Sequence, residues 1–206
     1  MADGLGLQGD QAQQPYSAAV VAGGQARRFA EDKACYPWRG RPLLAWVLES
    51  FPEPSERFVV ASRDYSRFSV PVYPDCFPES SSANGVYSAL HHAAQPWLAV
   101  AACDMPLLSA CYWRLLLLAR RSSVSVVIVA DARGRLEPLA ALYHRRIQSH
   151  FAAQLQQGQP AMQAMVHDAE AAGYGVQRLP RAYVQERCGA QVLHNINRKS
   201  DLRTLS

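Results

Sequence analysis

Several features that would assign a protein to a special environment are missing from this 206-residue chain. No apolar segment approaches the roughly 20 residues that a membrane-spanning helix needs, so a membrane protein is not expected. The cysteines number five, at positions 35, 76, 103, 111 and 188, with no Cys-x-x-Cys pair. Because an odd number argues against a complete disulfide framework, the sequence predicts buried free thiols in a reducing cytoplasm.

A strong excess of charge is also missing. Lys and Arg number 21 against 17 for Asp and Glu, which gives a formal net charge of only +4. Nucleic-acid-binding proteins usually carry runs of Lys and Arg, which this sequence lacks, so nucleic acid is not an expected partner. A mild positive surplus fits a phosphate-rich small substrate as well as solubility. The six histidines show no metal-ligand spacing supported by Cys or acidic partners.

Residues 1–15 differ in composition from the rest of the chain. They are rich in Gly and Gln, carry Asp3 where an export signal would be basic, and contain no apolar core of a signal peptide. We expect them to form a disordered leader. The chain is 49% hydrophobic, enough for one sizeable core, and no repeat or long linker divides residues 16–206. We therefore expect these residues to form a single domain.

Short apolar runs alternate with amphipathic stretches along that domain. Strands are expected at residues 18–21, 57–61, 70–73, 97–102 and 125–130, with a further apolar segment at 139–143. Helices are expected at about 42–51, 84–93, 109–121, 145–156 and 162–169. Such alternation is typical of βαβ units. The predicted fold is α/β, a Rossmann-like three-layer α/β/α arrangement with a mostly parallel mixed sheet.

The most informative stretch follows the first strand directly. Residues 22–28 read Ala-Gly-Gly-Gln-Ala-Arg-Arg, and Asp32-Lys33 follows shortly after. Glycine lets backbone N–H groups approach a ligand, and successive N–H groups form a concave anion site to which Arg28 and Lys33 add charge. The third glycine of a dinucleotide motif and the Gly-Lys-Ser/Thr ending of a P-loop are absent. The stretch therefore predicts a polyphosphate cradle of another kind.

Asp104 stands just beyond the carboxyl end of the apolar strand at 97–102. Ligands of open α/β sheets bind at this edge. A carboxylate there suits Mg²⁺, which takes one or two protein carboxylates and completes its shell with phosphate oxygens and water. By position alone, Asp104 could equally cap the next helix, so both interpretations stand.

The run Val21-Ala22-Gly23-Gly24-x-x-x-Arg28-Phe29-x-x-Asp32-Lys33 resembles the signature of nucleotidyltransferases that attach a nucleoside monophosphate to a phosphorylated acceptor. Within that group, the chain most resembles the molybdenum cofactor guanylyltransferases. Cys103-Asp104-x-Pro106, residues 137–143 and Asn195-Ile196-Asn197 match further segments of this family. The resemblance covers most of residues 17–205 and implies that the predicted domain is a nucleotidyltransferase domain.

The resemblance implies an activity and its participants. The reaction would be Mg²⁺-dependent transfer of GMP from GTP to the terminal phosphate of molybdopterin, with release of pyrophosphate. Mg²⁺ is the implied cofactor, and GTP or another nucleoside triphosphate and a phosphorylated pterin are the implied substrates. Transient contact with cofactor-delivery proteins is implied as well. Because the acceptor phosphate is the nucleophile, no Ser or Cys nucleophile is required.

The family's functional residues carry over to matching positions of this chain. The expected catalytic residues are Arg28 and Lys33, as clamps on the triphosphate, and Asp104, as the metal ligand. Nucleotide binding is expected from a larger set: Val21, Ala22, Gly23, Gly24, Arg28, Lys33, Asp75 and Asp104. On the acceptor side, Asn195 and Asn197 are expected near the metal and a phosphate, although paired asparagines are also common in turns.

Three neighbouring side chains are interpreted more simply. Asp75 either contacts the nucleotide, as in the family, or initiates a turn near its flanking prolines. Asp32 is expected to have a structural role, in which it orients Lys33 or fixes the loop. Arg27 is expected to be an exposed neighbour of Arg28.

Three stretches depart from the family pattern. Phe29-Ala30 stands where Met-Gly is usual, Ala61 lies near a position usually occupied by asparagine, and Ser82-Ala83-Asn84 replaces a Gly-Pro-Leu loop. Because that loop shapes the nucleotide pocket in the family, the choice between GTP, CTP and another nucleotide stays open. The alternatives are nucleotidyl transfer, such as cytidylyl transfer, to molybdopterin or to a sugar or alcohol phosphate, and a non-catalytic relative that binds a nucleotide or a partner.

Overall fold

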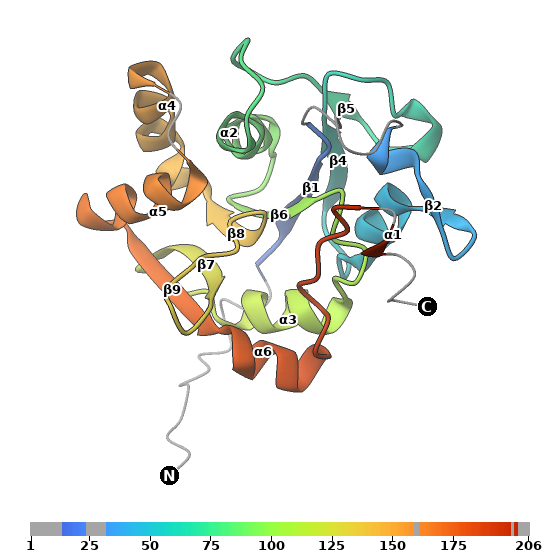
Figure 1. The fold of residues 1–206 in the computed structure, drawn as a ribbon. Coiled ribbons are helices and arrows are strands. Elements are labelled where there is room, and N and C mark those ends of the chain that lie inside the picture. Colours follow the sequence, from blue (N-terminus) through green and yellow to red (C-terminus); the bar gives the residue numbers. More distant parts are fainter. Residues whose placement is uncertain (1–13, 24–31, 159–160, 199, 202–206) are drawn as a thin grey trace.

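The structure, a computed structural model, describes residues 14–23, 32–158, 161–198 and 200–201. A seven-stranded sheet in the order β5-β4-β1-β6-β8-β7-β9 forms its middle layer (Figure 1). The strands are β1 Tyr16–Val21, β4 Glu56–Val60, β5 Val72–Tyr73, β6 Trp97–Ala102, β7 Val124–Ala130, β8 Ala140–His144 and β9 Gly175–Pro180. All of them share one direction except β8, which is antiparallel to both β6 and β7.

Helices cover both faces of this sheet (Figure 1). On one face lie α1 Leu43–Ser50, α3 Ala110–Leu118 and α6 Arg181–Cys188. On the other face lie α2 Ser82–His92, α4 Gln148–Gln157 and α5 Met162–Ala171. Short 3-10 helices occur at Lys33–Cys35, Ser66–Phe68 and Arg145–Ile147. The predicted three-layer α/β/α fold with a mostly parallel mixed sheet is confirmed.

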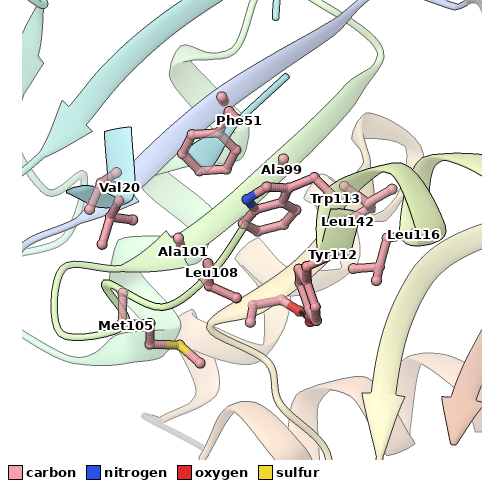
Figure 2. Close-up of a cluster of buried hydrophobic side chains, with 14 of the residues drawn as sticks. Val20, Phe51, Ala99, Ala101, Met105, Leu108, Tyr112, Trp113, Leu116 and Leu142 are labelled. Atoms are coloured by element: carbon pink, nitrogen blue, oxygen red, sulfur yellow. Dashed lines mark hydrogen bonds between the residues drawn. The ribbon is translucent and has the colours of Figure 1, made fainter. Parts of the chain in front are cut away.

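The central strands form because their sequences are apolar along their length. Every residue of β1, β6 and β7 is buried, as expected where helices cover both faces of a sheet. The small side chains of Ala99 and Ala101 on β6 leave room for Trp113 of α3 (Figure 2). The indole of Trp113 stacks on Phe51 with ring centroids 4.6 Å apart, and its Nε1 donates to Ser50 Oγ at 2.9 Å. This packing fixes β6, whose carboxyl end carries Asp104.

Helix α2 begins two residues earlier than the sequence predicts. Ser81 is its N-cap, and the Ser81 Oγ accepts a hydrogen bond from Asn84 N at 3.1 Å. A serine hydroxyl in this position satisfies one of the unpaired N–H groups of the first turn, which favours the earlier start. Ser82 and Ala83, expected to precede the helix, therefore form its first turn together with Asn84.

Three further elements were not predicted. A hairpin of β2 Pro37–Trp38 and β3 Arg41–Pro42 turns through Arg39 and Gly40, with φ values of 47° and 76°. Two central residues with positive φ are typical of the tightest hairpin turns. Strand β9 and helix α6 follow one another at the end of the sheet beside β7.

Among the described residues, no helix has both the length and the apolar character needed to cross a membrane.

Two cysteines are paired, which corrects the prediction of free thiols. Cys111 and Cys188 form a disulfide with Cα atoms 5.6 Å apart, although 77 residues separate them in the sequence. They meet because α3 and α6 pack side by side on the same face of the sheet (Figure 1). Cys35 and Cys103 are free and half-buried, whereas Cys76 is free and exposed.

Removing the disulfide is expected to destabilise the fold. A Cys111→Ser, Cys188→Ser variant should lose about 2–4 kcal/mol of unfolding free energy, because the bond closes a long loop in the unfolded chain. Urea unfolding measures this loss, and the wild type under reducing conditions should match the variant. Cys76→Ser is the control, since its thiol is exposed and free. Equal urea midpoints for the double variant and the oxidised wild type would show that the bond does not stabilise the protein.

Candidate active site

The carboxyl ends of β1 and β6 meet where the sequence predicts the phosphate cradle. Beyond β1, Ala22 N donates to Val60 O at 2.9 Å, and Cys103 N donates to Val21 O at 3.2 Å. These two backbone bonds join the end of β1 to β4 on one side and to β6 on the other. Val21, Ala22 and Gly23 therefore lie at the sheet edge where α/β proteins bind ligands.

Part of the predicted cradle cannot be placed. Gly24, Arg27 and Arg28, with the neighbouring Phe29-Ala30, lie outside the described residues. Their proposed roles as backbone donor, exposed neighbour and phosphate clamp stay predictions.

Lys33 and Asp104 are in direct contact at this edge. Lys33 lies at the start of the 3-10 helix Lys33–Cys35, and its Nζ donates to Asp104 Oδ2 at 2.7 Å. The same Nζ lies 3.4 Å from Asn197 Oδ1. The side chains of Lys33 and Asp104 are 18% and 19% exposed, so the ion pair is partly shielded from water. The structure thus brings together three residues that the sequence assigns to one site.

Asp104 does not cap the helix that follows it. The N-cap of α3 is Ser109, whose Oγ accepts from Tyr112 N at 3.4 Å. The second carboxylate oxygen of Asp104, Oδ1, is buried and has no hydrogen-bond partner among the described residues. A buried carboxylate oxygen is costly to leave without a donor or a cation. Asp104 therefore has an oxygen available for a ligand beside the one that Lys33 contacts.

The C-terminal segment reaches the same place. Ile196 N donates to Asp104 O at 2.9 Å, and the Ile196 side chain is fully buried against Trp38 and Leu43. Because Ile196 is held at Asp104, its sequence neighbours Asn195 and Asn197 lie at the same edge of the sheet. Asn197 reaches Lys33, and the buried Asn195 Oδ1 has no hydrogen-bond partner within the described part of the chain.

Asp32 has the structural role that the sequence predicts. It is the N-cap of the 3-10 helix that carries Lys33, and its Oδ1 accepts from Ala34 N at 3.1 Å. The same oxygen accepts from the hydroxyl of Tyr65 at 3.0 Å. Burial, together with the hydrogen bond to Asp32, raises the pKa of Tyr65, which stays a protonated donor. Asp32 thus fixes the segment that presents Lys33.

Asp75 lies on the other side of Gly23 and is half-buried. A Cβ placed on Gly23 would lie 3.9 Å from Asp75 Oδ2, an ordinary contact distance. Burial raises the pKa of the Asp75 carboxyl above its usual range. No hydrogen bond to this carboxylate is formed by the described residues, so it does not initiate a hydrogen-bonded turn there.

The Asp75 carboxylate, to which no described residue hydrogen-bonds, should lower stability at neutral pH. Its native pKa is raised, so the stability it contributes below its unfolded pKa is lost as pH rises through the native value. Asp75→Asn should therefore raise the unfolding temperature at pH 7 and leave it unchanged below about pH 4. Thermal unfolding without nucleotide measures this difference. A variant less stable than wild type at pH 7 would contradict it.

Some residues near the site were missed by sequence reasoning. Ser80 Oγ would lie 3.7 Å from a Cβ on Gly23, and Asn84 and Ser88 of α2 are fully buried. Two polar residues spaced i, i+4 on the apolar face of a helix were the available signal. Glu137, within a segment matched to the family, forms an ion pair with Arg181 at the start of α6, and no sequence signal indicated this pairing.

The described residues contain no cluster of three or more His, Cys, Asp or Glu side chains that could hold a metal alone. The edge instead offers, among the described residues, one carboxylate with an unpartnered oxygen, one ammonium group and two amides. Such a set can neutralise and orient a polyphosphate whose own oxygens complete a metal's coordination.

Comparison with known proteins places this chain among the nucleotidyltransferases. A family model described as a MobA-like NTP transferase domain matches residues 18–172, more than half of the chain. The chain therefore belongs to the MobA-like NTP transferase family, and it is a nucleotidyltransferase. The resemblance to the molybdenum cofactor guanylyltransferases is confirmed by curated relatives.

Two such relatives carry the name probable molybdenum cofactor guanylyltransferase. The protein from Deinococcus radiodurans is 32% identical over 195 residues, which cover 93% of this chain and 94% of the relative. The protein from Bacillus licheniformis is 30% identical over 203 residues, which cover 90% of this chain and 94% of the relative.

Solved structures support the fold. Molybdopterin-guanine dinucleotide biosynthesis protein A from Archaeoglobus fulgidus superposes with a TM-score of 0.76 at 24% identity, and the match covers 91% of this chain and 95% of that one. A nucleotidyl transferase from Methanothermobacter gives a TM-score of 0.73 at 17% identity, with 93% and 95% covered. At these identities the likeness shows the fold alone.

Proposed function

We propose that the chain catalyses Mg²⁺-dependent transfer of GMP from GTP to the terminal phosphate of molybdopterin, with release of pyrophosphate. The observation that carries the proposal is the contact of Lys33 Nζ with Asp104 Oδ2 at 2.7 Å, at the carboxyl edge of parallel strands where β1 ends. The choice of substrates rests on the names of the two curated relatives. A cytoplasmic location, expected from the cysteine content, and transient contact with cofactor-delivery proteins, implied by the family resemblance, complete the proposal.

The residues at this edge fit a magnesium ion. The buried Asp104 Oδ1 has no hydrogen-bond partner among the described residues, and the same is true of Asn195 Oδ1. Both are oxygen ligands, which Mg²⁺ prefers, and a single carboxylate is enough when phosphate oxygens and water supply the rest. Asp104 would hold the ion, with Asn195 close by. When bound, the ion supplies positive charge to the triphosphate and the departing pyrophosphate.

The chain's own residues bind and orient the reactants. An oxygen of the acceptor phosphate attacks the α-phosphorus of the nucleotide in line, while the bond to the bridging oxygen breaks and pyrophosphate leaves. Lys33, held by Asp104 and Asn197, directs its ammonium group toward the phosphates and stabilises their charge. Asp32 fixes the segment that carries Lys33, so little reorganisation is needed during the reaction.

A product assay tests this proposal. The purified chain is incubated with Mg²⁺, molybdopterin and each nucleoside triphosphate in turn, and pyrophosphate and the pterin dinucleotide are both measured. The proposal predicts that GTP gives equal amounts of both products, and that removal of Mg²⁺ with a chelator stops the reaction. Product from CTP in place of GTP would overturn the substrate assignment, and no product from any nucleotide would overturn the proposed reaction.

A further inference from the structure

A buried amide holds the segment that follows β5. The side chain of Asn84, in the first turn of α2, is fully buried. Its Nδ2 donates to Phe77 O at 2.7 Å and to Glu79 O at 2.9 Å, and its Oδ1 accepts from Phe77 N at 3.2 Å. One side chain thus hydrogen-bonds three backbone groups of residues 77–79.

Ser88 extends this network by one turn of the helix. Its hydroxyl is also fully buried, donates to Asn84 Oδ1 at 3.1 Å and accepts from Cys76 N at 2.8 Å. Together the two side chains satisfy backbone groups at Cys76, Phe77 and Glu79. Every donor and acceptor of the Asn84 amide is used, which is the condition under which a buried polar group stabilises one conformation.

Most of the segment held in this way is exposed to solvent. Residues 76 and 78–80 are exposed, and Phe77 packs on Tyr87 with ring centroids 5.3 Å apart. The two side chains that flank the segment, Asp75 and Ser80, both have an oxygen within 4 Å of a Cβ placed on Gly23. The conformation of residues 76–79 therefore decides where these two side chains lie relative to Gly23.

Helix α2 is itself anchored to the same strand end. A Cβ on Gly85 would lie 2.5 Å from Val21 Cγ1, closer than real contacts allow, so α2 approaches β1 closely because residue 85 is glycine. Asn84 precedes this contact point and Ser88 follows it by less than one turn. The position of the segment 76–79 relative to the end of β1 is thus set through α2.

We propose that Asn84, assisted by Ser88, is a positioning residue for the nucleotide: by fixing residues 76–79 it holds Asp75 and Ser80 beside Gly23 and completes one wall of the nucleotide site. This inference rests on the proposed function and assigns a role to a position where the sequence departs from the family's Gly-Pro-Leu. The nucleotide meets a wall that is already ordered, so its binding does not bear the cost of ordering the segment.

The test uses two variants and one matched control. Asn84→Asp keeps the size and one acceptor but cannot donate to Phe77 O and Glu79 O, and Ser88→Ala removes the two bonds of the hydroxyl. Ser50→Ala is the control, because it also removes a buried hydroxyl that hydrogen-bonds Trp113, but from α1. Calorimetric binding of GTP with Mg²⁺ is measured for each protein below its unfolding temperature.

The expected result is about a tenfold weaker GTP affinity for Asn84→Asp and a smaller loss for Ser88→Ala. In turnover, the KM for GTP should rise while kcat at saturating GTP and the KM for the acceptor stay within about twofold. Ser50→Ala should lower the unfolding temperature without changing GTP affinity, which separates positioning from general destabilisation. If Asn84→Asp does not fold, the GTP affinity of Ser88→Ala alone tests the positioning role.

Two results would overturn the inference, and only one of them also overturns the proposed function. Wild type that binds GTP, with both α2 variants binding it equally well, leaves the proposed function intact and refutes the positioning role. Wild type that binds no nucleotide refutes the proposed function, and the positioning role falls with it.

Discussion

Replacing Asp104 by Asn should lower the rate of nucleotidyl transfer by about 10²–10³-fold. The substitution keeps the size of the side chain but removes the negative charge that Lys33 contacts at 2.7 Å and the anionic oxygen that would hold the metal. Lys33 then loses its fixed position near the phosphates. The rate is measured as pyrophosphate release at saturating GTP and Mg²⁺, and nucleotide binding is measured in parallel.

Asp168→Asn is the matched control for this loss. Asp168 lies on α5, and its side chain is 61% exposed, so the same chemical change there should leave the rate within about twofold. An Asp104→Asn variant that retains more than a tenth of the wild-type rate at saturating Mg²⁺ would contradict the assignment of Asp104 as the metal ligand.

Replacing Trp113 by Ala should destabilise the fold by about 3–5 kcal/mol. The indole is fully buried between α1 and the sheet, stacks on Phe51 at 4.6 Å and donates to Ser50 Oγ at 2.9 Å (Figure 2). Its removal leaves a cavity beside the small side chains of Ala99 and Ala101, which cannot fill the space. The loss is a large fraction of the stability of a typical domain.

Urea unfolding of Trp113→Ala and Trp113→Phe measures this effect. The Phe variant keeps the aromatic stacking and loses only part of the volume and the indole N–H, so it should be destabilised by less than half as much. Trp46→Ala serves as the comparison, because Trp46 is only partly buried and packs on the β2–β3 hairpin. Equal losses for Trp113→Ala and Trp46→Ala would contradict the account of the core.

The strands of the sheet could be predicted because burial on both faces requires apolar residues at nearly every position. The runs that form β1, β6 and β7 are apolar at nearly every position, and each is fully buried. The approximate location of the site followed from the same runs, since Gly23 and Asp104 come directly after two of them. The carboxyl ends of parallel strands lie at one edge of the sheet, so residues that follow two such strands are expected at the same edge.

Strand β9 and helix α6, at the far end of the sheet, show no such apolar pattern. In β9 only Leu179 is buried, and in α6 only Val184 is buried, so neither has the apolar period of a strand or a helix. The Cys111–Cys188 disulfide depends on the packing of α6 against α3 and was missed with it. An odd cysteine count argues against a complete framework but does not exclude a single bond.

Within the site, the sequence predicted which residues are candidates better than it predicted which of them are in contact. The approach of Asn197 to Lys33 joins residues 164 positions apart, and only the family resemblance placed them together. The Asn84 network was not predictable because its partners are backbone groups, which every residue carries. The sequence indicated that position only as a departure from the family, without the reason for an amide there.

One calorimetric experiment tests the central claim most directly. The purified protein and its Asp104→Asn variant are titrated with GTP, CTP, ATP and UTP, each in the presence of Mg²⁺. The account predicts that wild type binds GTP in preference to the other three and that the variant binds it at least about tenfold more weakly. Preference for CTP would contradict the guanylyl assignment while leaving the site in place. Binding of no nucleotide would contradict the claim that this edge of the sheet is a nucleotide site.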